Sequence, residues 1–129
     1  METRSIGKLD ASVVGLGCNN FGGRIDADAT ERVVNAALDS GITLFDTADI
    51  YGGTRSEEYL GRALGSRRDE AIVATKFGGP IDDERRGGAS AAYIACAVED
   101  SLRRLGTDRI DLYQLHFPCL LYTSPSPRD

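Results

Sequence analysis

LFDTADIYGG, residues 44–53, joins a short apolar run to two carboxylates, a tyrosine and two glycines. Leu44 and Phe45 have side chains typical of a buried strand. Asp46 follows them directly, although a carboxylate is costly to remove from water where a buried strand ends. The stretch therefore predicts a strand whose end carries a charge that a partner or a ligand must stabilise.

Apolar runs typical of strands recur along the chain, at 12–17, 42–46, 71–76 and 110–116. Each is short and rich in Val, Ile and Leu, as in strands that are buried on both faces of a parallel sheet. The segment RSIGKLDAS at 4–12 precedes them and has a turn at Gly7 and Lys8. We expect this segment to be a hairpin that closes the bottom of a barrel.

Three helical patterns separate the strand runs, at 28–41, 56–65 and 90–106. Asp28 and Glu31 have the spacing of a capping box at the start of the first pattern. The caps predicted from the sequence are Asp28, Ser56 and Ser90 at the amino ends, and Gly41 and Gly106 at the carboxyl ends.

The resulting order, β-α-β-α-β-α-β, predicts the α/β fold class with four parallel strands and three helices. Because crossovers between parallel strands are right-handed, the carboxyl ends of all four strands would meet at one edge of the sheet. Two architectures fit this order: an open doubly wound sheet, and part of a (β/α)8 barrel.

Ionisable side chains follow three successive strand runs: Asp46 with Tyr51 in its loop, then Lys76, then His116. The carboxyl edge of a parallel sheet is where α/β enzymes carry their active sites. Reduction of a carbonyl needs a proton donor, and a tyrosine can donate if a lysine cation stabilises its phenolate. An aspartate would pair with the lysine, and a histidine would orient the carbonyl oxygen. Asp49 is interpreted as a turn or helix-capping residue.

The stretches FDTADIYGG, ATKFG and LYQLH, with GLGCNNFGG before them, resemble the aldo-keto reductase superfamily over residues 4–118. The resemblance implies the N-terminal half of a (β/α)8 TIM barrel, in an enzyme that reduces aldehydes and ketones with NADPH, or with NADH. It implies that Tyr51 donates the proton and that Lys76 stabilises the phenolate. Asp46 would pair with Lys76 and lie near the nicotinamide ribose, and His116 would orient the substrate.

The resemblance also implies a cofactor-binding set: Gly17, Cys18, Asn19 and Asp46. The family often has Thr-Trp in the first-strand loop, so Cys18 and Asn19 depart from its pattern. One aromatic side chain of the pocket wall is therefore missing here. The same stretch offers two glycines of a G-x-G-x-x-G motif, but Asn20 stands where the third glycine belongs. A Rossmann site is therefore disfavoured.

Composition excludes several other functions. The net charge of −5 argues against binding to nucleic acid or to an anionic membrane. No apolar run approaches the roughly 20 residues of a membrane span, and the start of the chain has no secretory h-region. The three cysteines are odd in number and far apart, which predicts neither a disulfide framework nor a metal site and favours the cytoplasm.

The segment CLLYTSPSPRD, residues 119–129, departs from the alternating pattern and has no amphipathic period. It resembles the translation of a sequencing-library adapter, and we expect a non-native or disordered tail after a domain at 1–118. A full barrel takes about 250 residues. We therefore expect the chain to be inactive alone and to self-associate through unpaired strand edges. A non-catalytic cofactor-binding sensor or regulatory subunit, and a small flavodoxin-like protein, are the alternatives.

Overall fold

The computed structural model describes residues 1–117, so the tail expected at 119–129 lies outside the described residues. The elements in chain order are β1 (Thr3–Ile6), β2 (Leu9–Ser12), β3 (Gly15–Gly17), α1 (Ala27–Asp39), β4 (Leu44–Asp46), α2 (Arg55–Leu64), the 3₁₀ helix η1 (Gly65–Glu70), β5 (Ile72–Phe77), α3 (Ala91–Leu105) and β6 (Leu112–Leu115).

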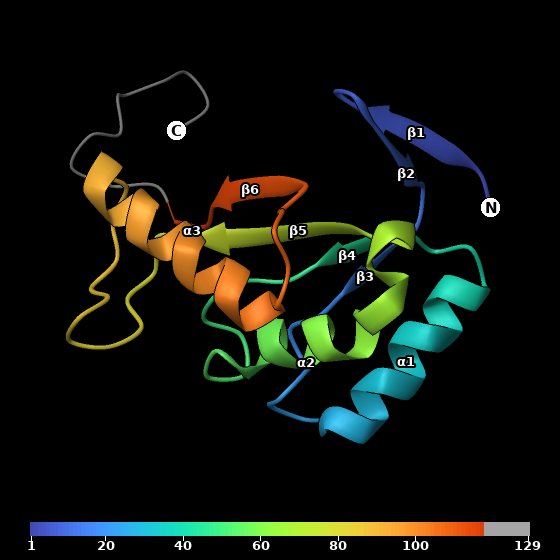
Figure 1. Ribbon diagram of the computed structural model, residues 1–129, viewed down its shortest axis with the longest axis horizontal. Helices are drawn as coiled ribbons and strands as arrows, with labels where there is room; N and C mark the ends of the chain where they lie inside the picture. The colour runs from blue at the N-terminus through green and yellow to red at the C-terminus, as the bar shows by residue number, and fades with distance from the viewer. Residues whose placement is uncertain (118–129) are drawn as a thin grey trace, which may run out of the picture.

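Strands β3, β4, β5 and β6 form one parallel sheet in the order in which they follow each other along the chain. A doubly wound sheet reverses its strand order at a switch point and carries helices on both faces. Here the order never reverses, and α1, α2 and α3 all lie on one side of the sheet (Figure 1). The α/β class and the half-barrel architecture are confirmed, and the doubly wound alternative is wrong.

The predicted hairpin is present as the antiparallel pair β1 and β2, with Gly7 in the turn at a φ of +61°. Ser12 at its end exchanges hydrogen bonds with Thr43, the residue just before β4. Ser12 N donates to Thr43 Oγ1 at 3.0 Å, and Thr43 N donates to Ser12 Oγ at 2.9 Å. The hairpin is thereby fixed at the amino ends of the strands, opposite the edge where the predicted functional residues lie.

Two helix starts differ from the prediction. The N-cap of α1 is Asp26, whose Oδ1 accepts a hydrogen bond from Ala29 N at 2.8 Å, so the assignment to Asp28 is wrong. Asp28 lies in the first turn, where a negative charge still complements the helix dipole. The N-cap of α2 is Thr54, at a φ of +74° and without a side-chain cap bond, so the assignment to Ser56 is also wrong.

The remaining caps follow the prediction. Ser90 caps α3 by accepting a hydrogen bond from Tyr93 N at 3.1 Å. Gly106 ends α3 at a φ of +62°, and Gly41 follows α1 at a φ of +89°. Both angles lie in the left-handed region that glycine adopts without a Cβ penalty.

The hydrophobic core lies between the sheet and the helices and includes Val34, Phe45, Leu60 and Val73, all fully buried. Successive side chains of a strand point to opposite faces of the sheet. Because Phe45 faces the helices, its neighbour Asp46 faces the other side, toward the interior of the half barrel. Packing of the core therefore determines which face of the sheet receives the carboxylate.

Candidate active site

The four predicted catalytic residues come together at the carboxyl edge of the sheet. Asp46 ends β4, Lys76 is the penultimate residue of β5, His116 directly follows β6, and Tyr51 lies in the loop between β4 and α2. Asp46 pairs in register with Ala74, two residues before Lys76, so both ionisable side chains project from the same face of the sheet.

Lys76 is the centre of this group. Its Nζ donates hydrogen bonds to Asp46 Oδ1 and to the Thr47 carbonyl oxygen, both at 2.9 Å, and to the Tyr51 hydroxyl at 3.4 Å. The Lys76 side chain is only 14% exposed. An ammonium group has three donors, and all three have acceptors here. The site therefore holds a largely buried cation against a tyrosine hydroxyl.

The His116 ring lies beside the Tyr51 side chain. Its centroid is 5.7 Å from that of Tyr51, with the two rings perpendicular, and it stacks on Phe117 at 4.2 Å. Burial, and then the Lys76 charge, hold the pKa of His116 below its ordinary value of 6.5 against the opposing charge of Asp46. The imidazole is thus neutral near pH 7, and its Nδ1 has no hydrogen-bond partner within residues 1–117.

The expected cofactor-binding residues line one hollow together with Tyr51. Its volume is about 180 Å³, and its walls come from Gly17, Cys18, Asn19 and Asp46 as well. Burial is the main reason that the pKa of Cys18 is raised to about 12, so the thiol stays protonated and acts as a small wall residue. Ligand pockets usually measure about 300 Å³ or more. The hollow is therefore large enough for only part of a ligand.

Sequence reasoning missed Gln114 and did not foresee the burial of Asp49. Gln114 Nε2 lies 3.4 Å from Asp46 Oδ1, and its place two residues before His116 puts it on the same face of β6. Strand alternation was the signal that could have found it. Asp49 lies in a turn, as predicted, but its side chain is buried and neither carboxylate oxygen has a hydrogen-bond partner in the described chain, so it caps no helix.

Ser56, predicted as a cap, instead joins α2 to two strand ends. It is fully buried, and its hydroxyl donates to the Cys18 carbonyl oxygen at 2.8 Å. The same hydroxyl lies 2.8 Å from Thr47 Oγ1. Ser56 thereby fixes the loops after β3 and β4, which carry the cofactor-binding candidates, against the start of α2.

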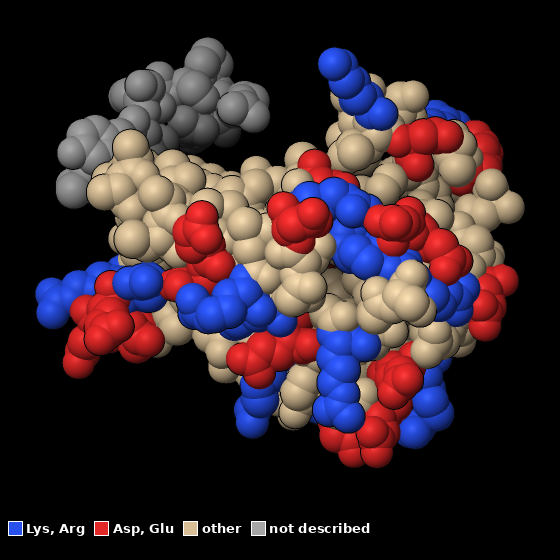
Figure 2. Space-filling view, in the orientation of Figure 1, with Lys and Arg blue, Asp and Glu red and all other residues tan. Residues whose placement is uncertain are grey.

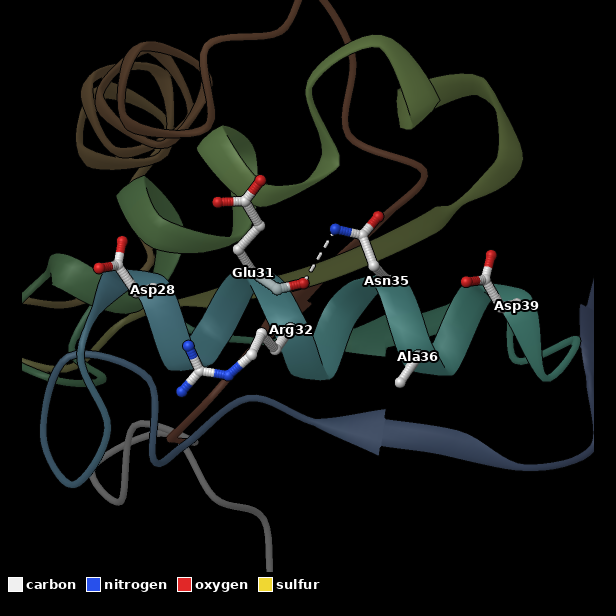
Figure 3. Close-up of a pocket in the computed structure, with 6 residues that line it drawn as sticks. All are labelled: Asp28, Glu31, Arg32, Asn35, Ala36 and Asp39. Atoms are coloured by element: carbon white, nitrogen blue, oxygen red, sulfur yellow. Dashed lines mark hydrogen bonds between the residues drawn. The ribbon is translucent and has the colours of Figure 1, made fainter.

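A second hollow lies along the outer side of α1 and is formed by successive turns of that helix (Figure 3). The residues that line it are Asp28, Glu31, Arg32, Asn35, Ala36 and Asp39. In Figure 3 their side chains point to different sides of the helix, and Asn35 donates to the Glu31 carbonyl oxygen of its own helix at 3.0 Å. This hollow is a solvated helix face and not a convergent site.

Surface charge and hydropathy add little to the description of the site. Basic and acidic side chains are interspersed over the face in Figure 2, without an extended field of one sign. None of the helices within residues 1–117 combines the length and the apolar composition that crossing a membrane requires.

Comparison of the sequence with known proteins gives a matching family and two similar proteins. A family model described as the Aldo/keto reductase family matches residues 13–122. The chain is 45% identical over 121 residues to the oxidoreductase YqkF of Bacillus subtilis (strain 168), covering 90% of this chain and 39% of that protein. It is 43% identical over 129 residues to Aldo-keto reductase YhdN of the same organism, covering 92% and 38%.

Structural comparison gives the same result. The aldo-keto reductase AKR11C1 from Bacillus halodurans (holo form) matches with a TM-score of 0.81 and 41% identity, covering 95% of this chain and 42% of that one. The chain thus spans about two fifths of the length of the relatives it matches. By its sequence, its strand order and its similarity to these proteins, the chain belongs to the aldo/keto reductase family.

Proposed function

We propose that this chain supplies the catalytic edge of a cytoplasmic oxidoreductase that reduces aldehydes and ketones to alcohols, with NADPH or NADH as the cofactor. The observation that carries the proposal is the position of Lys76 Nζ, between the Asp46 carboxylate at 2.9 Å and the Tyr51 hydroxyl at 3.4 Å. The family relationship and the names of the relatives support it.

Tyr51 acts as the proton donor in this proposal. A carbonyl oxygen gains negative charge as its carbon is reduced, and a hydroxyl within hydrogen-bond reach can protonate it. Donation leaves a phenolate, which the adjacent Lys76 ammonium stabilises. Asp46 pairs with that ammonium at 2.9 Å and thereby offsets the cost of its largely buried position.

His116 orients the carbonyl oxygen toward Tyr51. The neutral imidazole stands edge-on to the tyrosine ring, and it can donate one hydrogen bond without adding a charge to the site. Its stacking on Phe117 fixes the plane of the ring.

The residues of the small hollow fit one end of a dinucleotide. Asp46 is 45% exposed and engages its described neighbours through Oδ1, so that Oδ2 remains available to accept a hydrogen bond from a ribose hydroxyl. Gly17, Cys18 and Asn19 would form the wall beside it. The dihydronicotinamide supplies the hydride when it is bound.

We propose further that residues 1–118 are one part of a larger barrel and do not turn over substrate alone. The hollow of about 180 Å³ is too small for a dinucleotide with a substrate. Within residues 1–117, β3 and β6 each pair with a single neighbour, which leaves two strand edges for association with further barrel strands or with a second copy.

The test is a fusion of residues 1–117 to the remaining length of YqkF, assayed with NADPH and with NADH on a panel of aldehydes and ketones. A cooperative melt and binding of the nicotinamide cofactor establish that the fusion is folded. Turnover that Tyr51→Phe abolishes is the expected result. A folded fusion that binds cofactor without reducing any carbonyl would favour the non-catalytic sensor instead.

A further inference from the structure

Thr47, the residue that follows Asp46, links the lysine of the site to helix α2. It is fully buried, and its backbone N–H donates to the Ala74 carbonyl oxygen of β5 at 2.8 Å. Its carbonyl oxygen accepts a hydrogen bond from Lys76 Nζ at 2.9 Å. Its hydroxyl lies 2.8 Å from the hydroxyl of Ser56, in the first turn of α2. Thr47 therefore contacts both the lysine and a helix on the other side of the sheet.

The direction of the hydrogen bonds at Ser56 follows from the number of protons. A serine hydroxyl carries one proton, and a carbonyl oxygen can only accept. Ser56 donates its proton to the Cys18 carbonyl oxygen at 2.8 Å, so Thr47 must be the donor in its contact with Ser56. A hydroxyl chain thus runs from Thr47 through Ser56 to the Cys18 carbonyl. The Cys18 N–H donates to the Asp46 carbonyl oxygen at 2.9 Å, which brings the chain back to β4.

The hydroxyl chain is shielded from water, because each of its three residues is 0% exposed. Solvent cannot replace a partner lost in such a position, so the bonds restrain the groups that make them. The other acceptors of Lys76 are less restrained. The Asp46 side chain is 45% exposed, and the Tyr51 hydroxyl is the most distant of the three at 3.4 Å. The Thr47 carbonyl is therefore the acceptor that the protein interior holds most firmly.

The next residue of α2 holds the strand that carries the lysine. Glu57 is fully buried, and its Oε1 accepts a hydrogen bond from the Thr75 hydroxyl at 2.6 Å. Thr75 directly precedes Lys76, and neighbouring side chains of a strand point to opposite faces of the sheet. Thr75 thus faces α2, whereas Lys76 faces the interior of the half barrel. The first turn of α2 therefore reaches the lysine through the backbone of the strand ends.

We propose that Thr47 and Ser56 position the Lys76 ammonium group. Their hydroxyl chain fixes the Thr47 carbonyl, and this acceptor directs Nζ at the Tyr51 hydroxyl. A lysine side chain has a flexible four-carbon stem, so a fixed acceptor is needed to keep its end in one place. Thr47 and Ser56 touch no reacting atom and are positioning residues. Their effect on catalysis rests on the proposed function, whereas their effect on the lysine is defined by the contacts alone.

The first experiment uses the lysine content of the 129-residue chain. Lys8 and Lys76 are the only lysines in the sequence, so labelling with nitrogen-15 lysine gives two ammonium signals, which Lys8→Arg assigns. A hydrogen bond to a charged group stabilises enough to slow proton exchange with water about 10-fold. We expect Thr47→Val to speed exchange of the Lys76 ammonium protons by about this factor, and Ser56→Ala at least as much. Lys8, at an exposed position, should not respond.

Thr30→Val is the matched control for Thr47→Val. Thr30 is also fully buried, and its hydroxyl donates to a backbone carbonyl of its own helix start, that of Asp26, at 2.8 Å. Its loss should leave the Lys76 signal unchanged, and Thr47→Ser, which retains the hydroxyl, should keep exchange slow. Lys76 exchange that is equal in Thr47→Val and Thr30→Val would overturn the proposal. So would exchange in the unsubstituted chain as fast as that of Lys8.

The second experiment places Thr47→Val in the YqkF fusion and measures kcat and KM. The phenolate forms only as the proton is transferred, so a displaced lysine should lower kcat about 10-fold and change the KM values little. Thr47→Ser and Thr30→Val should retain the kcat of the parent fusion. An unchanged kcat in Thr47→Val would overturn the positioning role. A parent fusion without turnover would contradict the proposed function alone, because the exchange rates report on Lys76 without catalysis.

Discussion

Lys76 and Asp46 lie on adjacent parallel strands, and their Nζ–Oδ1 contact of 2.9 Å joins a lysine side chain that is 14% exposed to a carboxylate that is 45% exposed. The asymmetry separates two tasks. The buried ammonium is directed at the Tyr51 hydroxyl, whereas the half-exposed carboxylate keeps one oxygen available for a ligand. One ion pair can therefore serve both the proton donor and the proposed cofactor site.

Asp46→Asn separates activity from stability. The Asp46 side of the ion pair is 45% exposed, so Asp46→Asn should cost only about 1 kcal/mol and lower the thermal midpoint of the chain by a few degrees. Turnover by the YqkF fusion should fall by about 10-fold or more, because Lys76 loses the carboxylate that holds it, and cofactor affinity should fall as well. Asp10→Asn, at an exposed position in β2, is the matched control. Equal effects of the two substitutions would contradict the role of Asp46.

His116 gives a direct pH measurement, because it is the only histidine in the chain and its ring proton signals need no assignment. Burial and the Lys76 charge hold its pKa below 6.5, so proton NMR should give a midpoint below that value. The folded chain then binds this proton less tightly than the unfolded chain, and the contribution of His116 to stability decreases as the pH falls through about 6.5. Lys76→Met should move the midpoint upward. A midpoint at or above 6.5 in the unsubstituted chain would count against the geometry.

The contribution of Asp49 to stability should change with pH in the direction opposite to that of His116. Its pKa is raised to about 6 in the folded chain, so the folded state holds the proton more tightly than the unfolded state. Stability from this group is fully present below about pH 4, decreases as the pH rises through about 6, and amounts to a change on the order of 3 kcal/mol. In urea titrations, Asp49→Asn should therefore become more stable than the parent chain as the pH rises above about 6. Parallel pH profiles for the two proteins would contradict this.

Arg104→Met should destabilise the chain strongly. Glu57 is fully buried, and removal of Arg104 leaves its carboxylate with the Thr75 hydroxyl alone. Breaking one side of a buried ion pair costs about 3–5 kcal/mol. Arg4→Met breaks an exposed pair with Glu2 and should cost less than about 1 kcal/mol. Urea unfolding of the two variants measures the difference, and similar losses would show that the buried pair is not held as described.

The α/β class and the gathering of Asp46, Lys76 and His116 at one edge of the sheet were predictable from the sequence, because period and position along the chain determine both. The choice of a half barrel over a doubly wound sheet rested on the family resemblance, since both strand orders fit the same pattern.

The N-cap of α1 was not predictable, since Asp26 and Asp28 both suit a cap and only the path of the entering loop selects Asp26. The cap assignment of Ser56 was wrong, and the burial of Asp49 was not foreseen, for a related reason. Ser and Asp are frequent in caps and turns, and local sequence does not indicate that these two side chains are buried by distant strands and helices.

The most direct measurement of the central claim is carbonyl reduction by the YqkF fusion carrying Tyr51→Phe, compared with the fusion carrying Tyr59→Phe on α2. Loss of the proposed donor should lower the turnover number by about 10²- to 10⁴-fold while nicotinamide binding is retained, and Tyr59→Phe should leave turnover unchanged. Turnover by the Tyr51→Phe fusion equal to that of the Tyr59→Phe fusion would contradict the assignment of Tyr51 as proton donor.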